Sequence, residues 1–283
     1  MRFIALVAVL SLVVMSFYTQ QKASPLGYLS ALNPTLRTTT IVNDTLKKLV
    51  WSDEFNTGTR PDTTKWAYNI GTGQWGWGNN EAQYYTSDAT NARIENGNLI
   101  IEARKENKGG QKYTSARILT QGKFSWTYGR FEIRAKLPKG VGTWPAIWML
   151  GDNIKTVGWP ACGEIDIMEH VGKEQDIINW STHSKLNNWS IGTQLTNKAT
   201  VTGVSTGFHV YKMEWSKESI QFFVDNKLYY TSINEDKGLN YYPFLAPQFL
   251  LLNLAVGGNM GGAIIDDSIF PCRMEVDYVR VYQ

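Results

Sequence analysis

The sequence of 283 residues has little of several features that would place it in a special class. Two cysteines cannot staple a chain of this length, which excludes a disulfide-dense scaffold. Charged residues make up 19%, below the roughly 25% of an average globular domain, and 43% are hydrophobic, which excludes a disordered chain. Nine prolines and the lack of a fixed-period repeat exclude collagen-like and propeller folds. What remains is a folded domain whose surface depends on uncharged polar groups and on aromatic rings, which reach 13%.

One long apolar stretch is present, and it lies at the N-terminus. Arg2 precedes fifteen uncharged residues, 3–17, and polar residues follow. This pattern is too short for a membrane span and is typical of a secretory signal peptide, with an uncleaved anchor as the alternative. We therefore expect a signal peptide at 1–23, a linker or pro-segment at 24–46 and one folded domain at 47–283.

Cleavage near Ser24 changes the charge balance. It removes Arg2 and Lys22 from the net charge of +3 and leaves 26 basic against 25 acidic residues. Such a chain has no charge excess that would attract a polyanion. We expect a secreted protein, extracellular or periplasmic, that is a monomer with no nucleic-acid partner and no membrane span after signal removal.

Alternating apolar and polar residues predict an all-β fold. Residues 130–137 and 273–278 alternate with a period of two, and Asn96-Gly97 and Asp225-Asn226 are signals for hairpin turns. No stretch of twelve residues has a helical period with caps. We expect a β-sandwich or barrel. Cys162 and Cys272 lie beside expected strands and could form one disulfide; two free thiols are the alternative.

Three carboxylates lie within one otherwise apolar segment, GEIDIMEH at 163–170. In a regular strand Glu164 and Asp166 share one face and Glu169 points to the other. One bulged residue at Ile167-Met168 would return Glu169 to the same face. Two carboxylates that flank a scissile bond are what glycoside hydrolysis needs, whereas a calcium or structural acidic cluster is the alternative.

This segment and four others resemble glycoside hydrolase family 16. The others are WGNNEAQYY (77–85), YGRFEIRAKLPKGVGTWPAIWML (128–150), FLLLNLAVGGN (249–259) and VDYVRVY (276–282). The resemblance implies a β-jelly-roll sandwich of two curved antiparallel sheets with a concave substrate groove. It also implies a retaining mechanism, with Glu164 as nucleophile, Asp166 as assisting acid and Glu169 as general acid/base. Two residues separate Asp166 from Glu169, and this spacing resembles that of the laminarinase-like branch. Agarases and carrageenases share the same spacing.

The resemblance further implies the residues that bind sugar. Trp75 and Trp77 would be platforms on a glycine-rich loop, and Trp144 and Trp148 would line the positions nearest the cleaved bond. The residues alone favour core packing for the last two. Polar contacts would come from Asn80, Glu81, Arg130, Asn253 and, on the leaving-group side, His183.

A structural calcium ion is the one metal that the resemblance implies. Its ligands would be Glu54, the carbonyl of Gly97 and Asp277, and ordinary surface acids are the alternative. Catalysis itself would need no cofactor.

Taken together, these expectations describe an endo-β-1,3-glucanase that acts on a β-glucan polysaccharide and that could extend to mixed-linked β-1,3-1,4-glucan. A galactan hydrolase of the agarase or carrageenase type shares the acidic spacing and is one alternative. A non-catalytic β-glucan lectin is the other, although such proteins usually lack the acids.

Overall fold

Strands dominate residues 48–283, the part of the chain that the computed structural model describes. The predicted signal peptide at 1–23 and linker at 24–46 lie outside the described residues. Within the predicted domain the first strand begins at Leu49. Among the described residues, no helix has both the length and the apolar character that crossing a bilayer requires.

The strands form two sheets that pack face to face. The larger, ten-stranded sheet has the order β15 (Lys227–Ile233), β14 (Ser219–Val224), β13 (His209–Trp215), β8 (Gly129–Lys136), β17 (Cys272–Tyr282), β5 (Asn98–Lys108), β6 (Gln111–Ser115) and β3 (Gln83–Tyr85), with β1 (Leu49–Asp53) on β17 and β4 (Ala92–Glu95) on β5. The seven-stranded sheet has the order β12 (Leu195–Thr200), β11 (Ile177–His183), β10 (Glu164–His170), β9 (Thr143–Gly151), β16 (Gln248–Val256), β7 (Arg117–Leu119) and β2 (Ala67–Tyr68). All pairings are antiparallel except that of β3 with β6.

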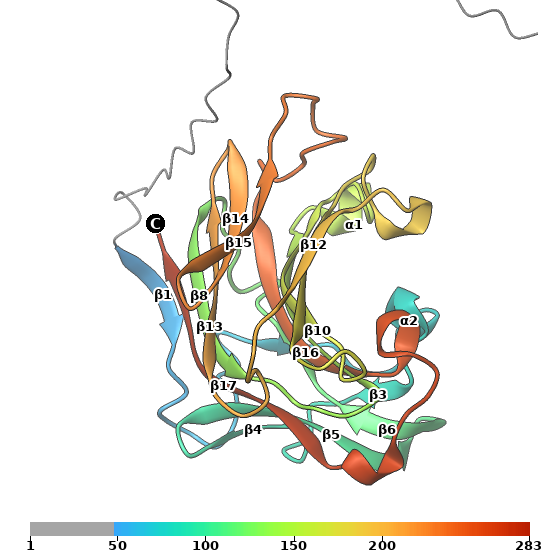
Figure 1. Ribbon diagram of the computed structural model, residues 1–283. Coiled ribbons are helices and arrows are strands. Elements are labelled where there is room, and N and C mark those ends of the chain that lie inside the picture. The colour runs from blue at the N-terminus through green and yellow to red at the C-terminus, as the bar shows by residue number, and fades with distance from the viewer. Residues whose placement is uncertain (1–47) are drawn as a thin grey trace, which may run out of the picture. The chain divides into compact units, whose positions relative to one another are not determined.

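Helical segments are few and short. They are α1 (Ile154–Val157), α2 (Gly258–Gly261) and the single turns η1 (Gly76–Asn80), η2 (Trp189–Ile191) and η3 (Asp267–Ile269). The seven-stranded sheet curves so that its concave side is turned away from the ten-stranded sheet, and α1 and α2 lie on that side (Figure 1). The expected sandwich of two curved sheets is confirmed.

The alternation in the sequence explains which face of each strand is buried. Along β8 every second residue, beginning with Gly129 and Phe131, is buried, and the residues between are half-exposed. Both predicted hairpins are two-residue turns with positive φ at each position, 52° and 75° at Asn96-Gly97 and 49° and 67° at Asp225-Asn226. These turns fit the strand twist, which fixes the register of β4 with β5 and of β14 with β15.

One continuous hydrophobic core fills the space between the sheets. It contains Phe131 and Ile133 of β8 together with Met149 of β9 and Ile165 of β10. Each sheet therefore has a second face that is turned away from this core. We call these the outer face of the ten-stranded sheet and the concave face of the seven-stranded sheet. Cys162 and Cys272 are both free, so the disulfide alternative is not realised.

Candidate active site

The acidic strand β10 lies in the middle of the seven-stranded sheet and contains the predicted bulge. Asp166 is paired with Ser181 of β11 and Glu169 with Asn179, so two residues of β10 are opposite one residue of its neighbour. The register with β9 shifts between the same positions. The extra residue restores Glu169 to the face that carries Glu164 and Asp166.

Burial of the intervening side chains agrees with this arrangement. Ile165, Ile167 and Met168 are fully buried in the core between the sheets. Asp166 and Glu169 are buried on the concave face, at 3% and 8% exposure, and Glu164 is partly exposed. The strand therefore separates its residues by chemistry, with apolar side chains toward the core and carboxylates toward the concave side.

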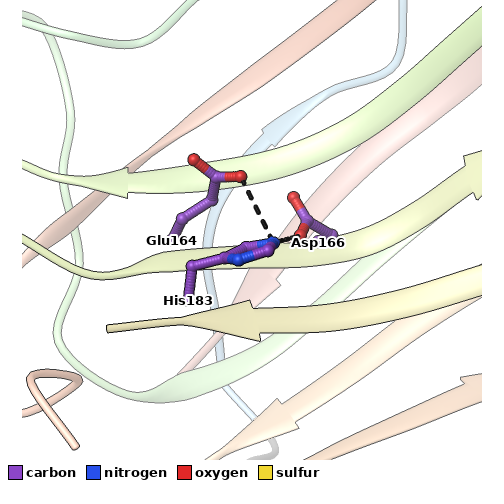
Figure 2. Close-up of side chains that lie close together, drawn as sticks. All are labelled: Glu164, Asp166 and His183. Atoms are coloured by element: carbon purple, nitrogen blue, oxygen red, sulfur yellow. Dashed lines mark ion pairs between the residues drawn. The ribbon is translucent and has the colours of Figure 1, made fainter. Parts of the chain in front are cut away.

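Glu164 and Asp166 lie beside one imidazole. His183 Nε2 is 3.2 Å from Asp166 Oδ2 and 3.7 Å from Glu164 Oε1, and Figure 2 shows the ring next to both carboxyls. The other oxygen of Glu164, Oε2, accepts a hydrogen bond of 2.8 Å from Trp159 Nε1. These contacts fix one oxygen of Glu164 and leave the histidine between the two acids.

Glu169 is held from the neighbouring strand. Trp144 of β9 donates its indole N–H to Glu169 Oε1 at 2.9 Å. In the described residues no lysine or arginine makes an ion pair with Glu164, Asp166 or Glu169. The carboxyls thus have N–H donors beside them but no lysine or arginine as an ion-pair partner.

Burial raises the pKa of all three carboxyls, to about 8 in each case. The charge of Asp166 adds to the rise at Glu164 and Glu169, while the indole donors and His183 oppose it. Neighbouring carboxyls of this kind do not all ionise at neutral pH. The cluster retains protons near pH 7, which allows one carboxyl to donate a proton beside an ionised neighbour.

A chain of hydrogen bonds extends from the acidic strand across β9 and β16. Trp148 Nε1 donates to Asn253 Oδ1 at 2.7 Å, and Asn253 Nδ2 donates to the hydroxyl of Tyr85 at 3.1 Å. That hydroxyl donates to Glu81 Oε2, which also accepts from Gln83 Nε2. Five buried or half-buried side chains are thereby fixed beside the catalytic candidates.

Arg117 of β7 lies between Trp77 and Trp148, and it was not among the residues predicted from the sequence. The guanidinium is 4.6 Å from the ring centroid of Trp148 and 5.0 Å from that of Trp77. Arg117 is buried at 8% exposure, and burial lowers its pKa although Tyr85 and Glu81 oppose this. A cation between two indole rings is stabilised by their π-faces and keeps the rings in place.

The glycine-rich loop 71–80 carries the remaining predicted platforms. Trp75 is 78% exposed, whereas Trp77 lies over Arg117 and bonds through Nε1 to the carbonyl of Gly71. Gly73 is required here because a Cβ would lie 2.5 Å from the Trp77 ring. Asn80 donates to Asn259 Oδ1 beyond β16. The loop thus joins the edge of the concave face.

The prediction for Arg130 is wrong. Arg130 lies on β8 of the other sheet, where it contacts Glu132 at 3.1 Å and the ring of Tyr282 at 4.2 Å. It alternates with the buried Phe131, so its side chain is on the outer face, on the far side of the core from Glu164. Arg117, which lies against the ring of Trp148, is the arginine on the concave face.

The carboxylates predicted to bind calcium are occupied by arginine side chains. Glu54 accepts two hydrogen bonds from Arg280, at 3.0 and 2.8 Å, and these lower its pKa. Asp277 accepts from Arg134 Nη1 at 2.5 Å. Both carboxylates therefore neutralise arginines, and the residues as arranged do not fit a side-chain calcium site.

Two aromatic contributions were also missed. Trp159 precedes the acidic strand in the string GWPACGEID, and its role at Glu164 depends on a chain reversal that spacing does not reveal. Tyr85 lies in a short strand of alternating polarity. The signal that could have identified Arg117 is the one used for the acids, a charged residue between apolar neighbours.

Comparisons with known proteins agree on one family. The family model described as Glycosyl hydrolases family 16 matches residues 79–280. A β-glucanase from Rhodothermus marinus is 51% identical over 246 residues, which cover 83% of this chain and 85% of the relative. The X-ray structure of the laminarinase from Rhodothermus marinus has a TM-score of 0.81 at 50% identity and covers 83% of this chain and 97% of its own. Two other curated relatives are longer, and this chain spans 34% and 38% of them.

A second similar structure contains sugar. It is a variant of SCLam, a non-specific endo-β-1,3(4)-glucanase, co-crystallised with a glucan oligosaccharide that presents 1,3-β-D-cellobiosyl-glucose at the active site. It is 46% identical, with a TM-score of 0.80, and covers 83% of this chain and 94% of its own. Residues 79–280, which the family model matches, include the acidic strand with its bulge and both Trp144 and Trp148. The chain belongs to glycoside hydrolase family 16.

Proposed function

We propose that this chain is a retaining endo-β-1,3-glucanase that also accepts mixed-linked β-1,3-1,4-glucan. The observation that carries the proposal is the bulge of β10, which presents Glu164, Asp166 and Glu169 on one face without a neutralising cation. Membership of family 16 and the likeness to a β-glucanase, a laminarinase and an endo-β-1,3(4)-glucanase support the substrate class.

Glu164 is the nucleophile and Glu169 the acid in the first step. The carboxylate of Glu164 attacks the anomeric carbon while the carboxyl of Glu169 gives its proton to the leaving glycosidic oxygen. A glycosyl ester on Glu164 and a free chain end result. In the second step Glu169 takes a proton from water, which attacks the same carbon and releases Glu164 as carboxylate. Two displacements at one carbon retain its configuration.

The neighbours of each carboxyl favour these roles. His183 lies against Glu164 and Asp166, where an N–H donor favours the ionised form of a nucleophile. Burial, and next the charge of Asp166, raise the pKa of Glu169 and favour retention of its proton. The indole donors of Trp159 and Trp144 each hold one oxygen, so that the other oxygen is oriented for reaction.

Substrate recognition follows from the uncharged character of the concave face. A glucan has apolar ring faces and hydroxyl edges, which match indole platforms and side-chain amides. Trp75, Trp77 and Trp148 supply platforms, and Asn80 and Asn253 supply amides. Arg117 has an Nε–H without a partner, which can be donated to a sugar hydroxyl.

A substrate panel tests the proposal. The purified protein is incubated with laminarin, lichenan, agarose and carrageenan, and new reducing ends are measured. We expect turnover of laminarin first and lichenan second, with products of several sizes from an early stage. NMR of fresh products should show the β-anomer first. Turnover of the galactans alone would replace the proposal with the galactan alternative.

One variant distinguishes the enzyme from a non-catalytic β-glucan lectin. Glu164→Gln keeps the volume and the hydrogen-bonding groups of the site and removes the nucleophile. We expect it to bind laminarin in affinity electrophoresis as the native protein does, but without turnover. A native protein that binds laminarin and never releases reducing ends would support the lectin instead.

Secretion is a separate part of the proposal, and the expected calcium ion needs a test of its own because its two carboxylate ligands are paired with arginines. Secretion is supported by the apolar N-terminal stretch, and N-terminal sequencing of protein from the culture medium tests it. A calcium ion at Glu54, Gly97 and Asp277 would have to displace Arg280 and Arg134. Thermal unfolding with excess calcium and with a chelator decides this point, since equal midpoints would remove the ion.

A further inference from the structure

The loop between β11 and β12, residues 184–193, presents three large apolar side chains to solvent. Leu186, Trp189 and Ile191 are 51%, 45% and 59% exposed. Trp189 begins the single turn η2. Exposed apolar side chains that cluster mark binding surfaces, and Trp75 is the only other exposed tryptophan among the described residues.

A buried asparagine makes this loop rigid. Asn188 is 3% exposed, and its side chain donates to the carbonyls of Ser184 and Lys185 and accepts from the N–H and hydroxyl of Ser190. Its backbone N–H donates to the hydroxyl of Thr193. The backbone on both sides of Trp189 is therefore fixed before any ligand arrives, which lowers the entropy cost of binding.

Trp189 is connected to the acidic strand through one other ring. Its centroid lies 5.9 Å from that of Trp159, with the planes inclined at 38°. Trp159 lies 6.2 Å from the ring of His183 and donates to Glu164. Trp189 is thus the outer member of an aromatic pair whose inner member contacts the proposed nucleophile.

This pair lies on the opposite side of β10 from the other sugar-binding candidates. The strand order places β9, β16 and β7, which carry Trp148, Asn253 and Arg117, on one side of β10. The other side is β11, with His183, and the loop that precedes β12. A polysaccharide cleaved in its interior must occupy both sides, because sugars extend in both directions from the scissile bond.

We propose that Trp189, supported by Trp159, is the platform for a sugar on the leaving-group side of the scissile bond. The inference rests on the proposed function and adds the residue that determines how strongly the departing chain is bound. The indole faces would contact the apolar ring face of a β-linked glucose unit. The glycosyl ester can also be transferred to a sugar hydroxyl instead of water. The same platform would then bind this acceptor sugar, because the acceptor takes the position that the departing sugar has left.

Two substrates that differ only on the leaving-group side test this platform. Laminarin has sugars on both sides of the bond that is cleaved. β-Laminaribiosyl fluoride has sugars only in the part that is transferred to Glu164, and its leaving group is a single fluoride. We expect Trp189→Ala to lower kcat/KM on laminarin about tenfold and to leave kcat/KM on the fluoride within about twofold. Trp189→Phe should recover most of the laminarin activity, because a ring face remains.

Controls make each outcome decisive. Ile191→Ala changes another exposed apolar side chain of the same loop and should leave both activities as in the native protein. Circular dichroism melting checks that the variants fold. An equal loss on both substrates would assign Trp189 a structural role, and no loss on either would remove the platform. If the native protein hydrolyses neither substrate, the proposed function itself fails, and the inference fails with it.

Discussion

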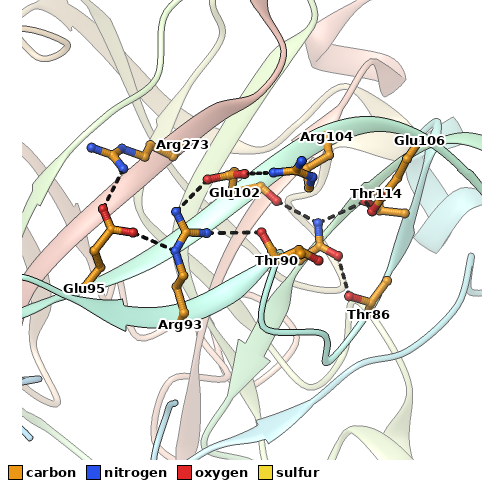
Figure 3. A network of polar contacts seen from close by, with 10 residues as sticks. Thr86, Thr90, Arg93, Glu95, Glu102, Arg104, Glu106, Thr114 and Arg273 are labelled. Atoms are coloured by element: carbon orange, nitrogen blue, oxygen red, sulfur yellow. Dashed lines mark hydrogen bonds and ion pairs between the residues drawn. The ribbon is translucent and has the colours of Figure 1, made fainter. Parts of the chain in front are cut away.

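Glu102 and Glu169 are buried to a similar extent, at 5% and 8% exposure, but on opposite faces of the sandwich. On the outer face Glu102 accepts from Arg93 at 2.8 Å and from Arg104, within a network that also ties Glu95 to Arg93 and Arg273 (Figure 3). On the concave face Glu169 has one indole donor and a second carboxyl beside it. The same residue type is neutralised in one place and left without a cation in the other.

This difference identifies where the fold gives up stability for chemistry. On the outer face Glu54 and Asp277 follow the pattern of Glu102, each with an arginine, and the pKa of Glu54 is lowered. On the concave face burial raises the pKa of three carboxyls together. Clustered acids whose pKa values are strongly shifted are typical of catalytic sites, whereas an ion-paired acid on a surface has a structural role.

The largest expected effect comes from removing one acid on each face. Glu164→Ser should lower kcat on laminarin by roughly 10⁴-fold, because the covalent step is lost. Glu54→Gln should change kcat by less than about twofold, since it breaks a surface ion pair with Arg280. Azide should restore turnover of β-laminaribiosyl fluoride by the serine variant and yield the α-glycosyl azide. Equal losses in both variants would mean that the contrast between the faces is unrelated to catalysis.

The two arginines sharpen the comparison at a smaller scale. Arg117→Met removes a buried cation from between Trp77 and Trp148 and should lower kcat/KM on laminarin about a hundredfold, as the rings lose their support and the sugar loses a donor. Arg130→Met removes an arginine of the outer face and should leave kcat/KM within about twofold. Steady-state kinetics on laminarin measures both. Loss of activity in the second variant would restore Arg130 as a substrate ligand.

Stability should respond to pH in opposite ways on the two faces. The pKa of Glu169 is about 8 in the folded chain and about 4.3 when unfolded, so the native state binds more protons between these values. Because the unfolded chain loses this proton at a lower pH than the native state does, the free energy of unfolding falls as pH rises toward 8. Glu169→Gln cannot ionise and should raise the melting midpoint by about 3 °C or more at pH 8.5, with a smaller gain at pH 5.

The matched variant on the outer face has the reverse dependence. The pKa of Glu54 is lowered by Arg280, so its contribution is present above the unfolded pKa and is lost as pH falls below it. Glu54→Gln should lower the midpoint slightly at pH 8.5 and hardly at all at pH 3. Melting curves at three pH values separate the cases, and parallel curves for the two variants would contradict the distinction.

Much of the fold and the centre of the site could be predicted from the sequence because they depend on local patterns. Alternation predicted the faces of β8, two-residue turn signals predicted two hairpins, and three acids in an apolar run suggested a bulge. Arg117 is a charged residue between apolar neighbours and could have been noticed, but the contacts that it and Trp159 make could not be predicted in the same way. Their roles depend on which distant strands become neighbours, and spacing along the chain carries no information on that.

The error at Arg130 has the same origin. A strand alternates regardless of which sheet it joins, so YGRFE predicts a half-exposed arginine on either sheet. Pairing of β8 with β13 and β17 decides that its polar face is the outer face. The sequence therefore correctly predicted that Arg130 is half-exposed, but wrongly predicted that it faces the substrate.

The smallest effect distinguishes two indoles within the concave face. Trp159 and Trp144 donate to Glu164 and Glu169, and each donor lowers the pKa of its carboxyl. Trp159→Phe should raise the pKa of the nucleophile and move the acidic limb of the kcat/KM profile up by roughly half a pH unit. Trp144→Phe should instead move the alkaline limb up, because the acid then keeps its proton to higher pH. Profiles on laminarin between pH 4 and 10 measure both limbs. If each variant moved the two limbs together, the acids would titrate as one unit, and separate roles for Glu164 and Glu169 would lose their support.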